Sequence, residues 1–208
     1  MEFNMKNATI ALLLICTAAF AQQKGTFKDS RDGKTYKTVK IGKLTWMAEN
    51  LNYATPESKC YDDKPDNCEK YGRLYRWGDA REACPSGWHF SKNDEWMALM
   101  KVAATDGYVI MAGTNLKAKS GWDRDDKKNK DGNGTDKYGF SALPGGYCSS
   151  KDKKCNYFDR AGTIGYWWTA DMTNIIHSPY WRIIYNNENL YTNDTDRYDF
   201  HSVRCVQD

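Results

Sequence analysis

The segment Cys84-Pro85-Ser86-Gly87-Trp88-His89-Phe90-Ser91-Lys92-Asn93-Asp94-Glu95-Trp96 joins a cysteine to the clearest helix signal in the chain. Ser91 stands three residues before the carboxylate of Asp94, which is the pattern of a helix N-cap. Apolar residues then follow at helical spacing as far as Ala104. The sequence therefore predicts a helix that begins at Ser91 and follows directly on the cysteine segment.

Upstream of this helix, the chain has the pattern of short strands separated by turns. Asp32-Gly33 and Gly42-Lys43 are tight-turn signals, and the residues beside them alternate between apolar and polar. The range 62–70 is charged and predicts a loop. The range 79–84 predicts a short helix that Pro85 ends.

Downstream, glycines break the chain into short runs. Strand-like stretches occur at 140–143, 166–170, 180–185 and 202–206, and Asn193-Asp194-Thr195 has the composition of a turn. Because the helix signals precede a run of short strands, the fold class is predicted as α+β, with one domain over residues 22–208.

The N-terminus has the pattern of a secretory signal peptide over residues 1–21. Lys6 precedes an apolar or small-residue run over 8–20, and Ala19-Phe20-Ala21 matches a cleavage site. A membrane anchor is the alternative, but a spanning helix needs about 20 apolar residues and this run is shorter. We therefore expect a bacterial protein that is secreted, periplasmic or on the outer cell surface, without a membrane span after cleavage.

Six cysteines follow the predicted signal peptide. In an exported chain they predict three disulfides, for which 15 pairings exist. Cys60 and Cys68 bracket one polar loop, Cys148 and Cys155 bracket another, and Cys84 and Cys205 remain. Metal ligation is the weaker interpretation, because no C-x-x-C occurs and oxidising conditions favour disulfides over thiolate ligands.

The charges indicate a solvated surface rather than a site for nucleic acid. The 30 Lys and Arg residues and the 27 Asp and Glu residues are interleaved, and the net charge is only +3. We expect no nucleic-acid partner.

Several phrases in one order resemble a known family. They are 32–36, 39–42, Trp46-Met47-Ala48-Glu49-Asn50-Leu51, Tyr71-Gly72-Arg73-Leu74-Tyr75, Cys84-Pro85-Ser86-Gly87-Trp88-His89, 134–136, Gly139-Phe140-Ser141-Ala142-Leu143-Pro144-Gly145-Gly146 and Ser202-Val203-Arg204-Cys205-Val206. Together they resemble the Fibrobacter succinogenes major paralogous domain, from about Asp29 to the end of the chain. Trp168 departs from the pattern, since a small hydroxyl residue is usual there.

The resemblance implies a fold similar to the C-type-lectin-like group, in which short helices pack on a loop-rich antiparallel sheet. In such folds a disulfide ties an early helix to the final strand, as a Cys84–Cys205 pair would. The resemblance carries over no activity. It implies exported or surface proteins that attach to plant polysaccharide or to a cell-surface partner.

Catalysis has little support in the sequence. His89, His177 and His201 are far apart, and no G-x-S-x-G, H-E-x-x-H or P-loop occurs. We interpret His89, between Trp88 and Phe90, as a packed, hydrogen-bonded side chain. A carbohydrate-active or protein-modifying enzyme of the lectin-like group is the alternative function, because a carboxylate pair is a spatial feature that sequence does not reveal.

A calcium site is a second weak candidate. Asn129, Asp131, Asn133 and Asp136 crowd one glycine-rich loop with oxygen ligands. The EF-hand spacing fails, because Lys127 occupies the first ligand position. A turn in which these side chains bond their own backbone is favoured, and no cofactor is predicted.

Aromatic residues are the predicted ligand-binding groups. Exposed flat rings stack on apolar sugar faces, and this chain has 8 Trp and 14 Tyr. Trp167 and Trp168 point to opposite faces of a strand, so we expect one of them at the surface and choose Trp168. The full set of candidates for a glycan or cell-surface protein is Trp122, Tyr147, Tyr157, Trp168 and Trp181.

Overall fold

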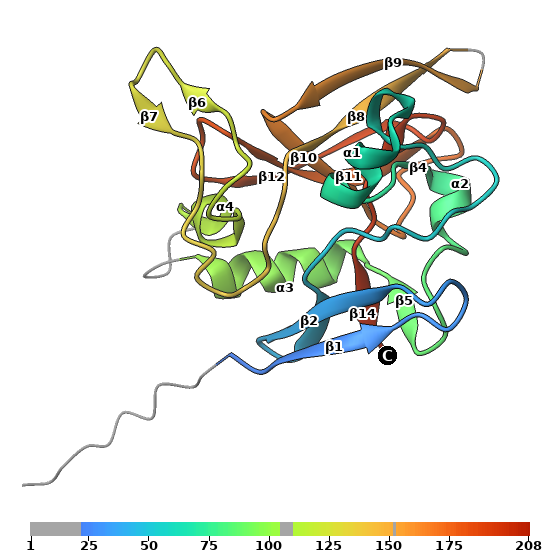
Figure 1. Cartoon of the computed structure of the whole chain (residues 1–208), viewed down its shortest axis with the longest axis horizontal. Coiled ribbons are helices and arrows are strands. Elements are labelled where there is room, and N and C mark those ends of the chain that lie inside the picture. The colour runs from blue at the N-terminus through green and yellow to red at the C-terminus, as the bar shows by residue number, and fades with distance from the viewer. Residues whose placement is uncertain (1–21, 105–109, 152) are drawn as a thin grey trace, which may run out of the picture.

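The computed structural model describes residues 22–104, 110–151 and 153–208. The predicted signal peptide lies outside the described residues. Within them the chain forms two larger antiparallel or mixed sheets, a small two-stranded sheet and a few short helices (Figure 1). The α+β class is confirmed.

The smaller of the two main sheets contains both early and late strands of the chain. Its order is β1-β2-β3-β14-β5. The hairpins predicted at Asp32-Gly33 and Gly42-Lys43 are confirmed, since β1 pairs with β2 and β2 with β3. The strands are β1 (Lys24–Lys28), β2 (Thr35–Ile41), β3 (Leu44–Met47), β14 (Cys205–Gln207) and β5 (Trp88–Phe90).

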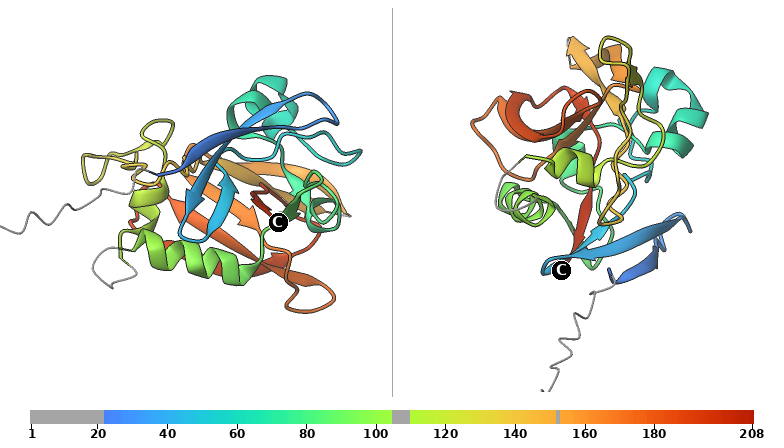
Figure 2. Two further views of the ribbon diagram at one scale, coloured as in Figure 1. Left: turned by 90° about the horizontal axis from the view of Figure 1, so that it is seen from below. Right: turned by 90° about the vertical axis from the view of Figure 1, so that its left-hand side faces the viewer.

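The larger sheet has the order β12-β11-β10-β8-β13-β4, and β9 pairs with β8 off this path. The N-terminal hairpin and the β8–β9 hairpin lie at opposite ends of the molecule (Figure 2). The strands are β12 (Leu190–Asp196), β11 (His177–Ile184), β10 (Ile164–Trp168), β8 (Gly145–Lys151), β13 (Phe200–His201), β4 (Tyr75–Arg76) and β9 (Lys154–Ala161), while β6 (Arg124–Asp125) and β7 (Lys130–Asp131) pair separately.

Four α-helices and one 3₁₀ turn complete the described residues. They are α1 (Pro65–Tyr71), α2 (Trp77–Ala80), α3 (Asn93–Ala103), α4 (Ala112–Leu116) and the turn over Tyr61–Asp63. The loop predicted over 62–70 is therefore wrong. Its charges lie on the exposed face of α1, and Pro65 at the first helical position suits a helix start.

The predicted long helix is present, but its start differs. It begins after Lys92, whose backbone N–H donates to the Glu95 carboxylate at 2.7 Å. The Ser91 hydroxyl instead accepts a hydrogen bond from the Trp96 indole at 2.9 Å. The sequence thus marked the correct region but assigned the wrong residue as the cap.

One strand prediction and one turn prediction also need correction. In the range 140–143 only Ala142 forms a bridge, with Lys117. The range 193–195 is not a turn but part of β12, which pairs with β11 over seven residues. Its polar composition suits an edge strand whose outer side faces solvent, which is why apolar patterning did not reveal it.

The three predicted disulfides are present: Cys60–Cys68, Cys84–Cys205 and Cys148–Cys155. The first closes the loop that leads into α1, and the third closes the β8–β9 hairpin. The second joins residues 121 positions apart in sequence and ties the segment before β5 to β14.

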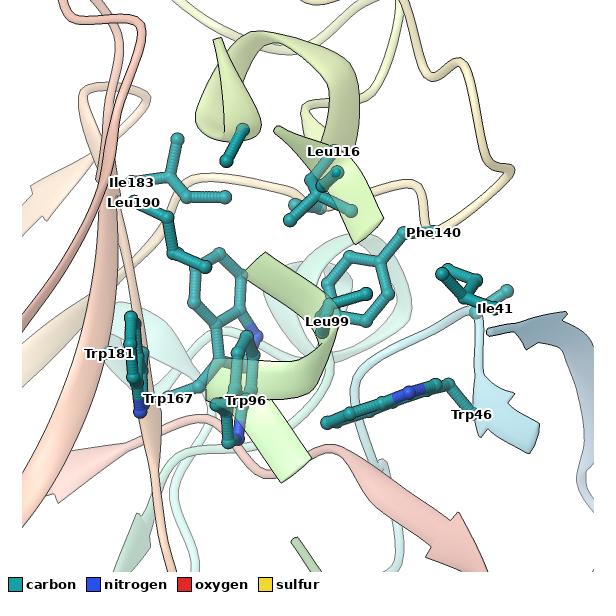
Figure 3. Packing of buried hydrophobic residues seen from close by; sticks show 14 of the residues in the cluster. Ile41, Trp46, Trp96, Leu99, Leu116, Phe140, Trp167, Trp181, Ile183 and Leu190 are labelled. Atoms are coloured by element: carbon teal, nitrogen blue, oxygen red, sulfur yellow. The ribbon is translucent and has the colours of Figure 1, made fainter. Parts of the chain in front are cut away.

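The main core lies between α3 and the two large sheets (Figure 3). Trp96 on α3 is its centre and has no solvent exposure. Its ring contacts Trp46 of β3 at 5.2 Å between centroids, Trp167 of β10 at 5.8 Å and Trp181 of β11 at 6.2 Å. A second core on the opposite face of β10 contains Trp168 and Trp77. The larger sheet is therefore covered on both faces.

Candidate functional site

A polar cleft of about 450 Å³ opens where β2, the segment after β3, the end of α1 and the 141–143 segment meet. This volume is in the range of pockets that hold small ligands. The cleft is lined by residues 34–37, 48–50, 52, 68–72, 118, 141 and 143. Most of these residues belong to the sequence phrases quoted above for the family resemblance, although no single phrase singled them out as a site.

Asn50 lies on the buried side of the cleft and uses all of its hydrogen-bonding groups. Its Nδ2 donates to the Tyr71 carbonyl at 2.8 Å and to the Ser202 hydroxyl at 3.3 Å. Its Oδ1 accepts from Trp167 Nε1 at 2.8 Å and from Arg204 Nε at 2.7 Å. A buried amide with every group satisfied fixes the positions of its partners, so Asn50 holds the cleft wall to the main core.

Arg204 is fully buried behind Asn50. Besides Asn50, its guanidinium donates to the carbonyls of Met47 at 2.9 Å, Phe140 at 2.7 Å and Ser141 at 3.1 Å. None of the described carboxylates forms an ion pair with it, and burial lowers the pKa of Arg204 to about 9. The charge is compensated by carbonyl and amide dipoles, which hold the 140–141 side of the cleft in place.

Gly72 lets α1 approach the segment after β3 at the base of the cleft. Its φ is +75°, and a Cβ at this position would lie 2.7 Å from Cβ of Asn50. A side chain is therefore excluded for reasons of both space and backbone conformation.

Charged side chains of both signs form the rim. Glu49 accepts a hydrogen bond from the Lys37 backbone N–H at 2.7 Å, and Lys37 Nζ lies 3.7 Å from the same carboxylate. Asn52 Nδ2 donates to Glu69 at 3.4 Å, and Lys70 Nζ lies 4.7 Å from the centroid of the Tyr71 ring. The rim therefore offers ammonium and amide donors beside carboxylate acceptors.

A family model of the Fibrobacter succinogenes major domain matches residues 39–207, which is most of the chain. The chain belongs to this family. The resemblance drawn from the sequence phrases is thus confirmed. No curated protein and no solved structure matches the chain.

Three of the aromatic residues predicted to bind a ligand are buried in this major domain. Trp122 donates to the Ala142 carbonyl, Trp168 to the Tyr75 carbonyl and Trp181 to the Asn93 amide oxygen. The predicted exposure of these three rings is wrong. Trp167 and Trp168 do point to opposite faces of β10, but each face is covered by its own core. The prediction treats the sheet that contains β10 as exposed on one face, whereas the structure covers both faces of this sheet.

The other two predicted residues lie on the β8–β9 hairpin and not in the cleft. Tyr157 on β9 is 62% exposed. Tyr147 on β8 is half-buried, and its ring packs against Tyr166 at 5.1 Å. They flank the Cys148–Cys155 disulfide as the sequence suggested, but the structure brings neither of them to the polar cleft.

His89 has the packed, hydrogen-bonded environment predicted from its neighbours. Its ring nitrogens lie 2.8 Å from Glu95 on α3 and 2.8 Å from Asp208. Partial burial lowers the pKa of this imidazole, but the two carboxylates outweigh that effect and the pKa is raised overall. His89 thus links β5, α3 and the residue after β14.

His201 on β13 is buried among aromatic rings. It stacks on Trp168 at 4.2 Å between centroids, and its Nδ1 has no partner among the described residues. Burial lowers the pKa of His201 to about 3. The folded protein therefore holds this imidazole neutral over the range in which an unfolded chain, with a histidine pKa near 6.5, takes up a proton.

We expect His201 to make the domain less stable in mild acid. Because its folded-state pKa is lowered, stability is lost as the pH falls from about 6.5 towards about 3, by up to about 1.4 kcal/mol per pH unit. His201→Phe keeps an aromatic ring against Trp168 and should flatten this part of the profile. Urea unfolding at pH 7 and pH 4.5 measures the difference, and equal pH dependence in the variant and the parent would contradict it.

The side chains of the loop weighed above as a weak calcium candidate bond to nearby protein groups. Asp131 accepts from the Asn133 backbone, Asn133 from the Trp122 backbone, and Asp136 from the Ser141 backbone and hydroxyl. Asn129 accepts from Arg124. Within residues 22–104, 110–151 and 153–208, no three His, Cys, Asp or Glu side chains form a group that could hold a metal ion.

Among the helices of the described residues, none has both the length and the apolar character that a membrane span requires.

Proposed function

We propose that this major domain is an exported, non-catalytic binding module with a C-type-lectin-like fold, and that its polar cleft takes a glycan such as a plant polysaccharide. The observation that carries the proposal is the cleft itself. Its rim sets carboxylates, amides and ammonium groups side by side on a rigid, hydrogen-bonded wall. Sugar hydroxyls both donate and accept hydrogen bonds, so a mixed rim of this kind suits them.

Two further features support the export and fold parts of the proposal. Three disulfides are typical of proteins that work in oxidising compartments, and the apolar N-terminal run precedes them. The Cys84–Cys205 bridge joins the segment just after α2 to the strand β14, which is close to the helix-to-final-strand bridge expected for the lectin-like group.

Binding to insoluble cellulose and other polysaccharides tests the proposal. The double variant Glu49→Gln and Glu69→Gln should weaken retention at least tenfold, because hydrogen bonds from sugar hydroxyls to charged acceptors contribute about 1.5–3 kcal/mol each. Glu82→Gln, an exposed carboxylate away from the cleft, is the matched control. Tyr157→Ala tests the aromatic surface separately.

The outcomes separate the candidate functions. Loss of retention in the cleft variant alone supports the cleft, whereas loss in Tyr157→Ala alone would move the site to the β8–β9 hairpin. Absence of retention on every glycan tested would contradict the proposal. The enzyme alternative rests on Glu49 and Glu69 lining the same cleft. If the parent protein released reducing sugar ends from a polysaccharide and the Glu49→Gln variant did not, the function would be hydrolysis and not binding alone.

A further inference from the structure

The loop between β10 and β11 presents an unusual apolar tip. Ile175 is 86% exposed, and Met172, Ile176 and Tyr198 beside it are also exposed. Ile175, Ile176 and Tyr198 line a shallow cleft of about 280 Å³ together with Arg76 and Arg197. Apolar side chains that gather in this way on a surface mark a place where another surface binds.

The tip is held in one conformation by hydrogen bonds. The Asn174 side-chain oxygen accepts from the backbone N–H groups of Ile176 and His177, each at 2.8 Å. Arg197 donates from its backbone to the Ile176 carbonyl at 2.9 Å and from its guanidinium to the Ile175 carbonyl at 3.1 Å. Because the loop is already ordered, the exposed isoleucines lose little conformational entropy when they are covered.

Cations surround the tip. Arg197 and Arg81 both lie over the Trp77 ring, at 4.0 and 5.4 Å from its centroid. Lys153 lies 5.1 Å over the Tyr198 ring, and Lys151 and Lys154 stand beside it on the same hairpin. None of these five cations forms an ion pair with another described residue. The carboxylates of Asp79 and Glu57 are both paired with Arg76, and that of Asp171, at the start of the loop, accepts a hydrogen bond from the Asn93 backbone N–H at 2.6 Å.

We propose that the 171–176 loop and Tyr198 dock the domain onto a lipid bilayer that carries anionic headgroups. The isoleucines would enter the boundary between headgroups and acyl chains, and the unpaired cations would bind the headgroups around them. This combination of apolar insertion and basic flanking residues is what interfacial anchors use. A second copy of this chain fits poorly, because a two-fold contact would set the same cations against one another.

The test is co-sedimentation with phosphatidylcholine vesicles that contain or lack phosphatidylglycerol. We would use the chain from Gln22 onward, which contains all the sheets and both cores, so that the apolar N-terminal run does not contribute. Ile175→Ser with Ile176→Ser should weaken binding to the anionic vesicles at least tenfold. Lys153→Gln with Lys154→Gln should weaken it about tenfold, and added salt should do the same.

Val102→Ser is the matched control. Val102 is an exposed apolar residue near the C-terminal end of α3, where it lies beside Gly42 and not in the 171–176 loop. Circular dichroism would verify that each variant is folded. If the double isoleucine variant did not fold, the double lysine variant would still test the proposal. Equal binding to neutral vesicles, no binding at all, or an equal loss in Val102→Ser would overturn the proposal. If the parent protein formed dimers and the double isoleucine variant did not, the proposal would also be overturned, because the loop would then mediate self-association. None of these results depends on the polar cleft.

Discussion

Replacing Cys84 and Cys205 together with alanine is expected to lower the free energy of unfolding by about 5 kcal/mol. The bridge closes a loop of 121 residues, and the entropy that a cross-link removes from the unfolded chain grows with loop length. Cys205 is also fully buried, so the loss of its sulfur adds a packing cost. Urea unfolding under non-reducing conditions measures the change.

The matched control is the double alanine variant of Cys148 and Cys155. The two cysteines of this pair are only 7 positions apart, and the same model gives about 2.5 kcal/mol. If the short bridge proved as stabilising as the long one, loop-closure entropy would not account for the effect.

Replacing Arg204 with methionine is expected to destabilise the domain by about 3–5 kcal/mol. Methionine fills a similar volume, but the Asn50 side chain and the carbonyls of Met47, Phe140 and Ser141 would each lose a charged donor. A buried acceptor without a donor costs about 1–3 kcal/mol, which outweighs the relief from no longer burying the charge.

Arg204→Lys separates charge from geometry. Lysine keeps the positive charge but lacks the planar fork that reaches several acceptors at once, so we expect a loss close to that of methionine. A lysine variant as stable as the parent would show that charge alone holds the network. Because Asn50 and Ser141 line the cleft, both variants should also weaken polysaccharide retention at temperatures where they remain folded.

The sequence predicted those parts of the fold that local patterns determine. Asp32-Gly33 marked the first hairpin, and loop spacing marked Cys60–Cys68 and Cys148–Cys155 as pairs. The family model matches residues 39–207, a range that contains all but the first of the phrases that carry the family resemblance. In each case the signal lies within a few neighbouring residues or in the order of short phrases.

The site could not be predicted in the same way, because it depends on contacts between distant segments. Asn50 meets Arg204 across 154 positions and Trp167 across 117. Strand alternation puts Trp168 on the face opposite Trp167, but it does not indicate whether that second face of the sheet is covered. Composition likewise did not reveal that Ile175 would project into solvent, since apolar residues in a short loop resemble the edge of a strand.

The position of β14 has a consequence for how the domain folds. This strand pairs with β3 on one side and with β5 on the other, so residues 205–207 fill a gap between segments that lie much earlier in the sequence. The smaller sheet therefore cannot be completed by local hairpins alone. Because its central strand comes from so distant a segment, we expect the sheet to form slowly during folding.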